Sequence, residues 1–131
     1  MNKHIFKVVI ALSLIIILIF SWGYYCSKLL KTTSSGLDAT AASLEDLVKS
    51  NKWEEADKKL SDIQKSWDKT EPKWAIMIDH FEIDNIDNSM VRMSKFVEEK
   101  SPDDALAELG ALRKFIQHIP LKNALTIKNV L

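Results

Sequence analysis

A stretch without any charged side chain, residues 8–27, places the strongest constraint on how this chain can fold. It is about 20 residues long, the length that an α-helix needs to cross the hydrocarbon core of a bilayer. Aromatic residues and then lysines close it, as expected at the headgroup level of a membrane. These residues are Trp22, Tyr24, Tyr25, Lys28 and Lys31. Residues 1–31 are therefore predicted to form a transmembrane anchor with basic flanks, in contact with lipid through residues 8–27.

Two other interpretations of this N-terminus stay open. Its basic start and the small residues Ser21 and Gly23 fit a signal peptide that is cleaved after Gly23. A lipoprotein anchored at Cys26 is disfavoured, because two bulky tyrosines precede the cysteine. The α-amine together with Lys3 and Lys7 slightly outweighs the two lysines that follow the span. The positive-inside rule then predicts a single-pass protein of the cell membrane, with a cytoplasmic N-terminus and an extracytoplasmic domain.

The rest of the chain is acidic. All 18 acidic residues of the 131-residue chain follow residue 31, whereas four of the 18 basic residues lie within residues 1–31, so the remainder has a net charge of about −4. Its lysines alternate with acids instead of forming a stripe, which argues against binding to nucleic acid. Cys26 is the only cysteine, so the chain cannot form an internal disulfide. Glycine and proline are rare, which favours long helices joined by short turns.

The first two helices of the domain are predicted from hydrophobic spacing. Residues 32–36 form a short polar linker, either a hinge or a continuation of the membrane helix, and the helical domain comprises residues 37–131. Asn51 and Glu54 resemble a capping box at the start of the second helix. That helix carries a narrow apolar seam of Trp53, Ala56, Leu60, Ile63 and Trp67. The seam needs one partner surface.

A long third helix is predicted from Pro72 to Glu99, the longest in the domain, with apolar residues on two sides as in a central helix. Ser101 and Pro102 then supply a helix N-terminus. Pro120 is predicted to end the fourth helix and to begin a short terminal one. The expected fold is all-α: an N-terminal transmembrane helix, an antiparallel four-helix domain of two helical hairpins, and a short C-terminal helix.

A faint internal repeat supports the two hairpins. At an offset of about 49 residues, apolar positions of one half match those of the other, as Leu44 matches Met93 and Leu60 matches Leu109. Each half then consists of a helix, a polar turn and a second helix.

Several segments together resemble a clostridial and bacillar family of short single-pass membrane proteins that carry a "domain of unknown function". They are the lysine-flanked apolar start, Asn51 to Ala56, Trp67, Trp74 to Ile86, Ala105 to Leu109, and His118 to Pro120. The resemblance implies a membrane-anchored helical domain and a spore-forming source, and it implies no activity. Ala75 departs from the pattern, since a second aromatic residue is expected beside Trp74.

Two sets of residues are candidates for binding. His80, Asp84 and Asp87 share one helix face and offer a nitrogen and carboxylate oxygens to a divalent cation. The alternative is that His80 and Asp84 bond each other or a neighbouring helix while Asp87 faces solvent. A second set is a patch of tryptophans that either binds a partner or belongs to the core. Its members are Trp53, Trp67 and Trp74.

Two acids, Asp79 and Glu82, lie near apolar sides of the same predicted helix. A carboxylate there needs a partner, and we expect Arg92, Arg113 or a helix N-terminus to provide it.

No motif for catalysis or cofactor binding is present, so neither an enzyme nor a cofactor is expected. The sequence favours a membrane-anchored helical module that binds a protein, and the expected partner is an integral membrane protein. The alternatives are a domain that senses a ligand or divalent cation through the His80 face, and an anchored homo-oligomer built through the Trp53 to Trp67 seam.

Overall fold

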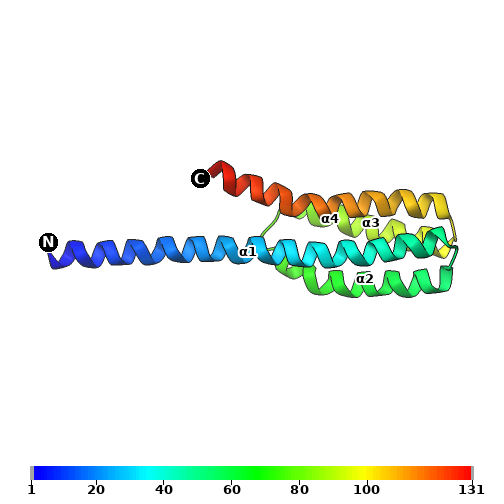
Figure 1. The fold of residues 1–131 in the computed structure, drawn as a ribbon, viewed down its shortest axis with the longest axis horizontal. Helices are drawn as coiled ribbons and strands as arrows, with labels where there is room; N and C mark the ends of the chain where they lie inside the picture. Colours follow the sequence, from blue (N-terminus) through cyan, green and yellow to red (C-terminus); the bar gives the residue numbers. More distant parts are fainter. Residues whose placement is uncertain (1, 131) are drawn as a thin grey trace.

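The computed structural model describes residues 2–130 of the chain, with side chains described for residues 2–123. The described part folds into four helices, which run alternately up and down (Figure 1): α1 (Lys3–Lys49), α2 (Trp53–Trp74), α3 (His80–Glu98) and α4 (Pro102–Val130). Around the bundle, α1 packs on α2 and α4, and α3 closes the ring by packing on the same two helices. The predicted all-α fold with two helical hairpins is confirmed.

Helix α1 is a single unbroken helix of 47 residues, about 70 Å long. Its first half projects beyond the bundle (Figure 1), and the apolar side chains from Ile5 to Phe20 are exposed. From Cys26 onward one stripe of the same helix is buried, including Leu30 and Leu37. The projecting part is long and apolar enough to cross a membrane, a property that signal sequences share.

The polar residues 32–36 lie inside α1. Of the two possibilities for this segment, a hinge or a continuation of the helix, the structure has the continuation. The bundle also begins earlier than residue 37, because Cys26, Leu30 and Ser34 are already buried. A rigid helix therefore joins the apolar projection directly to the bundle.

The turns of the two hairpins have the same conformation. Asn51 and Lys100 both have a φ of 54°, in the left-handed region. In the first turn the Lys52 amide donates to the Leu47 carbonyl, and in the second the Ser101 amide donates to the Phe96 carbonyl. These bonds satisfy carbonyls at the helix ends in a Schellman arrangement.

Equivalent residues of these turns are 49 positions apart, so the predicted repeat is a real structural repeat. The capping box expected at Asn51 is wrong, because this residue is the left-handed one in the turn after α1, and the N-cap of α2 is Lys52, which makes no side-chain cap bond.

The long third helix expected between Pro72 and Glu99 is divided in the structure. Helix α2 continues through Pro72 to Trp74, and α3 begins at His80. Asp79 is the N-cap of α3, and its carboxylate accepts a hydrogen bond from the Phe81 amide at 3.1 Å. The apolar residues that pointed to two sides of one helix are divided instead among the end of α2, the loop 75–79 and α3.

The separate C-terminal helix expected after Pro120 is also wrong, because α4 runs through Pro120. Proline has no N–H to donate to the carbonyl of Ile116, four residues earlier. Ser34 of α1 donates its hydroxyl to that carbonyl at 2.7 Å. The bond is buried, so a polar residue of the supposed linker replaces the hydrogen bond that the proline removes.

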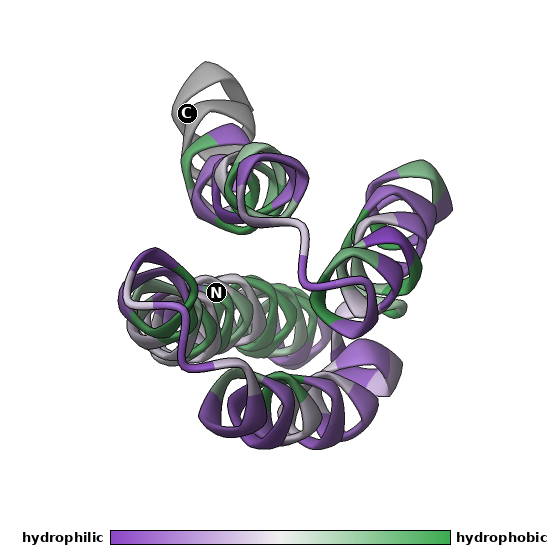
Figure 2. Ribbon diagram, turned by 90° about the vertical axis from the view of Figure 1, so that its right-hand side faces the viewer, coloured by the Kyte–Doolittle hydropathy of each residue, from purple (hydrophilic) through white to green (hydrophobic). Residues whose placement is uncertain are grey.

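The core lies along the axis of the bundle, and all four helices contribute to it. Seen end-on, the hydrophobic residues turn toward the space between the helices, and the far part of α1 is hydrophobic over most of its surface (Figure 2). The largest fully buried side chains are those of Trp74, Leu30, Leu44, Ile63, Ile86, Met93, Leu109, Leu112, Ile116 and Val48.

Candidate functional site

The candidate tryptophans belong mainly to the core. Trp67 and Trp74 are 3% and 0% exposed and meet edge to face, with ring centroids 5.4 Å apart. The Trp67 indole donates to Asp87 at 2.6 Å, and the Trp74 indole donates to the Thr33 hydroxyl at 2.8 Å. Both polar atoms thus have acceptors inside the chain. Trp53 is half-buried and packs on the edge of the core.

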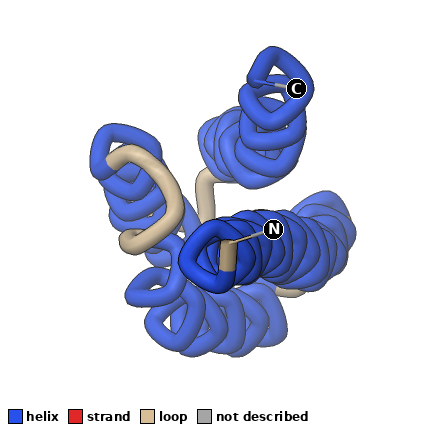
Figure 3. The backbone as a smooth tube through the Cα atoms, turned by 90° about the vertical axis from the view of Figure 1, so that its left-hand side faces the viewer, coloured by secondary structure: helices blue, strands red, loops and turns tan. Residues whose placement is uncertain are grey.

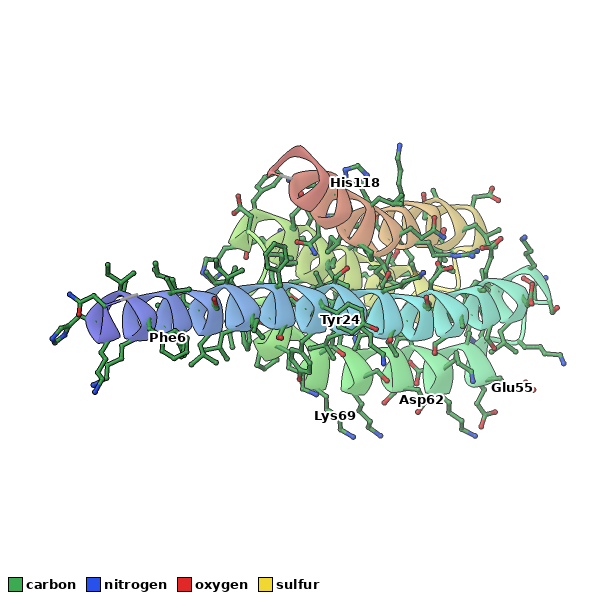
Figure 4. The ribbon with its side chains drawn as sticks, turned by 60° about the vertical axis from the view of Figure 1, so that its left-hand side comes forward. Phe6, Tyr24, Glu55, Asp62, Lys69 and His118 are labelled. Atoms are coloured by element: carbon green, nitrogen blue, oxygen red, sulfur yellow. The ribbon has the colours of Figure 1, made fainter. Side chains whose placement is uncertain are left out.

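The apolar seam of α2 is used within the chain. Ala56, Leu60 and Ile63 are buried in the core together with Trp67. The opposite face of α2 is charged: Glu55, Asp62 and Lys69 point away from the bundle (Figure 4). Four of the five seam residues therefore pack inside the bundle of a single chain, and Trp53 is partly buried at its edge.

The candidate cation ligands do not act as one group. Asp87 accepts the hydrogen bond from Trp67, whereas His80 and Asp84 are exposed on α3. Among the described residues, no cluster of three or more His, Cys, Asp or Glu is placed to hold a metal ion. The alternative, in which His80 and Asp84 bond to neighbours and Asp87 faces solvent, is reversed in the structure, because Asp87 is the residue that bonds to another helix.

The two acids expected to need partners have them. Asp79 lies at the N-terminus of α3, one of the partners predicted for it. Glu82 accepts from Lys122 of α4 at 2.9 Å instead of pairing with an arginine. The side chain of Glu82 is only 13% exposed. The ion pair therefore ties the start of α3 to α4.

Arg113 and Arg92 bind other carboxylates. Arg113 of α4 donates to Asp38 at 2.8 Å and to Glu45 at 2.9 Å, both on α1. The hydrogen bond from Arg113 lowers the pKa of Asp38 below its usual 3.8. Hydrogen bonds from Lys49 and then from Arg113 lower the pKa of Glu45 below 4.5. These charges hold α1 and α4 together.

The second network joins α3 to α4. Glu108 accepts from Arg92 at 2.8 Å and from the buried Ser89 hydroxyl at 2.6 Å. Burial raises the pKa of Glu108, but the bonds from Arg92 and Ser89 outweigh it, so the pKa lies below its usual value. Both arginine networks serve the packing of the bundle.

A shallow groove lies between α2 and α3 on the flank of the bundle. Its volume is about 330 Å³, and it is lined by Gln64, Trp67, Asp68, Asp87, Met90 and Val91. Val91 is 64% exposed. The groove combines an apolar floor with polar side chains at its rim, a composition found in protein-binding sites. Sequence reasoning missed Val91, because it lies outside the apolar stripe of α3.

Comparison with known proteins identifies the domain. No curated protein and no solved structure matches the chain. A family profile, described as a domain of unknown function (DUF4363), matches residues 24–130. This range covers the four-helix bundle and begins within the last turn of the predicted membrane span, residues 8–27. The chain therefore belongs to the DUF4363 family of domains of unknown function.

Proposed function

We propose that this chain is a membrane-anchored helical module that binds another membrane protein. The observation that carries the proposal is the continuity of α1, which has an exposed apolar half and a half that forms one wall of the bundle. Such a helix holds the bundle beside the bilayer without a flexible linker. A partner in the same membrane then meets the bundle at a high effective concentration.

The groove between α2 and α3 is the proposed binding surface. Val91, exposed on α3, lines the groove together with the buried ring of Trp67 and the acids Asp68 and Asp87. An apolar side chain of a partner, flanked by a basic one, would complement this surface. The proposal includes a single-pass topology, with the N-terminus in the cytoplasm and the bundle outside it, because the α-amine together with Lys3 and Lys7 gives the N-terminal flank one positive charge more than Lys28 and Lys31 give the other flank.

Anchoring is tested separately from binding. Membranes from cells that express the full chain are washed with alkaline carbonate, and the intact mass of the protein is measured. An anchored chain stays in the membrane fraction with residues 1–23 present. Release of a chain that begins at Tyr24 would show instead that the segment is a cleaved signal peptide.

Binding is tested by photo-crosslinking in the native membrane. A photoreactive amino acid replaces Val91 in the groove, and the matched control replaces Asp62 on the charged outer face of α2. The proposal expects a membrane protein crosslinked from position 91 and absent from position 62. Identical products from both positions, or none from either, would contradict it.

A further inference from the structure

Exposed apolar side chains gather at one end of the bundle. Among the described residues, the large hydrophobic side chains that are exposed beyond the projecting part of α1 are those of Ile76, Phe81, Val91 and Leu121. Ile76 lies in the loop between α2 and α3, Phe81 in the first turn of α3, and Leu121 in the last third of α4. Ile76 is 77% exposed and Phe81 is 68% exposed. Only Val91 lies well away from this end.

This end of the bundle is the one from which α1 projects. In Figures 1 and 3 the loop between α2 and α3 and the C-terminal end of α4 lie on the side of the projecting helix. A cavity of about 240 Å³ shows which residues of α1 lie at the height of the loop. It is lined by Trp22, Gly23 and Cys26 of α1, by Ile76 and Met77 of the loop, and by Asn123 of α4. The loop thus lies beside the end of the apolar segment.

The level of the loop can be compared with the expected position of the bilayer. The uncharged span ends at residue 27, and Trp22 lies about 8 Å before that end at 1.5 Å per residue. Amphipathic segments that bind the bilayer surface reach a depth of about 5–10 Å. If a bilayer surrounds residues 8–27, Ile76 therefore lies at the boundary between the lipid headgroups and the acyl chains, where apolar side chains of interfacial segments insert.

We propose that the loop 75–79, through Ile76 and with Phe81 beside it, inserts into the lipid interface around α1 and seats the bundle on the membrane. The inference rests on the proposed membrane anchoring. The occupant of this surface is lipid, because the apolar patch is continuous with the lipid-facing side of α1.

The chemistry of the loop suits the interface. The amides of Met77 and Ile78 both donate to the Trp74 carbonyl, at 2.8 and 2.9 Å, so these groups need no water. Lys28 and Lys31, exposed on α1, and Lys73, exposed on α2, lie at the same end of the bundle. Their ammonium groups reach the phosphate level while Ile76 lies deeper.

The test places an environment-sensitive fluorophore on the full chain in nanodiscs, one chain per disc. Cys26→Ala removes the native thiol, and Ile76→Cys carries the label. Val91→Cys is the matched control, because it is also an exposed apolar residue but lies about 11 residues along α3 from the loop. Leu14→Cys reports on the span itself. Discs contain phosphatidylcholine and phosphatidylglycerol, with or without lipids that carry a nitroxide high on the acyl chain, and circular dichroism checks each variant for helix content.

The proposal expects blue-shifted emission at position 76 that nitroxide lipid quenches several-fold more than at position 91. Quenching at position 14 without quenching at position 76 would overturn the seating of the loop and leave the anchor intact. Absence of quenching at both positions would overturn the anchor as well. A blue shift at position 76 that nitroxide lipid does not quench would assign the patch to a protein contact and would also contradict the proposal.

Discussion

At the scale of single residues, the polar stretch near the middle of α1 holds the bundle together. Thr33 accepts from the Trp74 indole, and Ser34 donates to the Ile116 carbonyl. Thr33 also donates to the Leu29 carbonyl at 2.7 Å, one turn before it. These small hydroxyl residues allow α1 to approach α2 and α4 closely while they satisfy buried polar groups. Polar composition alone could not distinguish this role from that of a linker.

The bond between Ser34 and Ile116 leads to a double-mutant prediction. Ser34→Ala leaves the buried Ile116 carbonyl without a donor, and we expect it to lower the free energy of unfolding by about 1–3 kcal/mol. In the Pro120→Ala background the new amide can donate to the same carbonyl, so Ser34→Ala should cost clearly less there. Urea unfolding of the four proteins in detergent micelles measures the difference. Equal costs in both backgrounds would show that the serine does not replace the proline's missing bond.

The Arg113 network predicts a dependence of stability on pH. The pKa values of Asp38 and Glu45 are lowered in the folded state, so their stabilisation is complete above the usual values of 3.8 and 4.5. It is lost as the pH falls from those values toward the lowered ones. Arg113→Met should therefore cost about 1–2 kcal/mol at pH 7 and much less near pH 3. Unfolding by urea at both pH values measures this.

A surface pair supplies the control for that experiment. Lys58 and Glu54 are 75% and 89% exposed and lie 3.6 Å apart. Lys58→Met should change the stability little at either pH, because water screens an exposed pair. A loss from Arg113→Met that stays the same at pH 3 would attribute the effect to packing of the long side chain.

At the scale of helices, hydrophobic spacing was a good guide to where helices lie and a poor guide to where they end. The core positions of α2 and α4, such as Leu60, Ile63 and Leu109, follow from spacing alone. Pro72 and Pro120 were interpreted as helix boundaries, yet both lie inside helices. The hydrogen bond that Pro120 cannot donate is replaced by one from Ser34 on α1. Such a contact between helices cannot be inferred from the residues next to the proline in sequence.

The break between α2 and α3 had a signal in the sequence. Asp79 followed three residues later by Glu82 fits an N-cap and its third helical residue. The apolar residues around it hid this signal, since no glycine or proline interrupts them. These apolar residues fell on two sides of the predicted long helix because the chain turns at the loop 75–79. A loop that is apolar because it faces lipid would lack the usual polar signature of a loop.

The continuity of α1 predicts different effects for two insertions. One alanine inserted between Leu18 and Ile19 extends an exposed part of the helix, and we expect the thermal unfolding of the bundle to stay within about 1–2 °C. One alanine between Ser35 and Gly36 rotates the residues before it by about 100° relative to those after it. It then separates Thr33 and Ser34 from their partners, and we expect a loss of about 2–4 kcal/mol. Circular dichroism of both proteins in the same detergent measures this, and equal tolerance would show that residues 32–36 act as a linker.

At the scale of the whole molecule, the bundle and the uncharged apolar segment 8–27 overlap within one helix. The sequence led to a division at residue 37, based on polarity, whereas burial begins at Cys26 and the family match at residue 24. The candidate binding residues were harder to predict, because their roles depend on contacts between helices distant in sequence. Asp87 lies on the predicted face of α3, yet its hydrogen bond comes from Trp67 on α2.

Two truncated chains test where the folded unit begins. A chain of residues 24–131 keeps every buried residue of α1, and we expect it to unfold cooperatively with the midpoint of the full chain. A chain of residues 37–131 lacks Leu30, whose burial contributes about 2–3 kcal/mol, and exposes Trp74 at the end of the core. We expect its stability to fall by about 3–5 kcal/mol, a large part of what a domain of this size has. Urea unfolding followed by tryptophan fluorescence compares the two. If the shorter chain is as stable as the longer one, the first two turns after the span belong to the anchor and the bundle is not built into it.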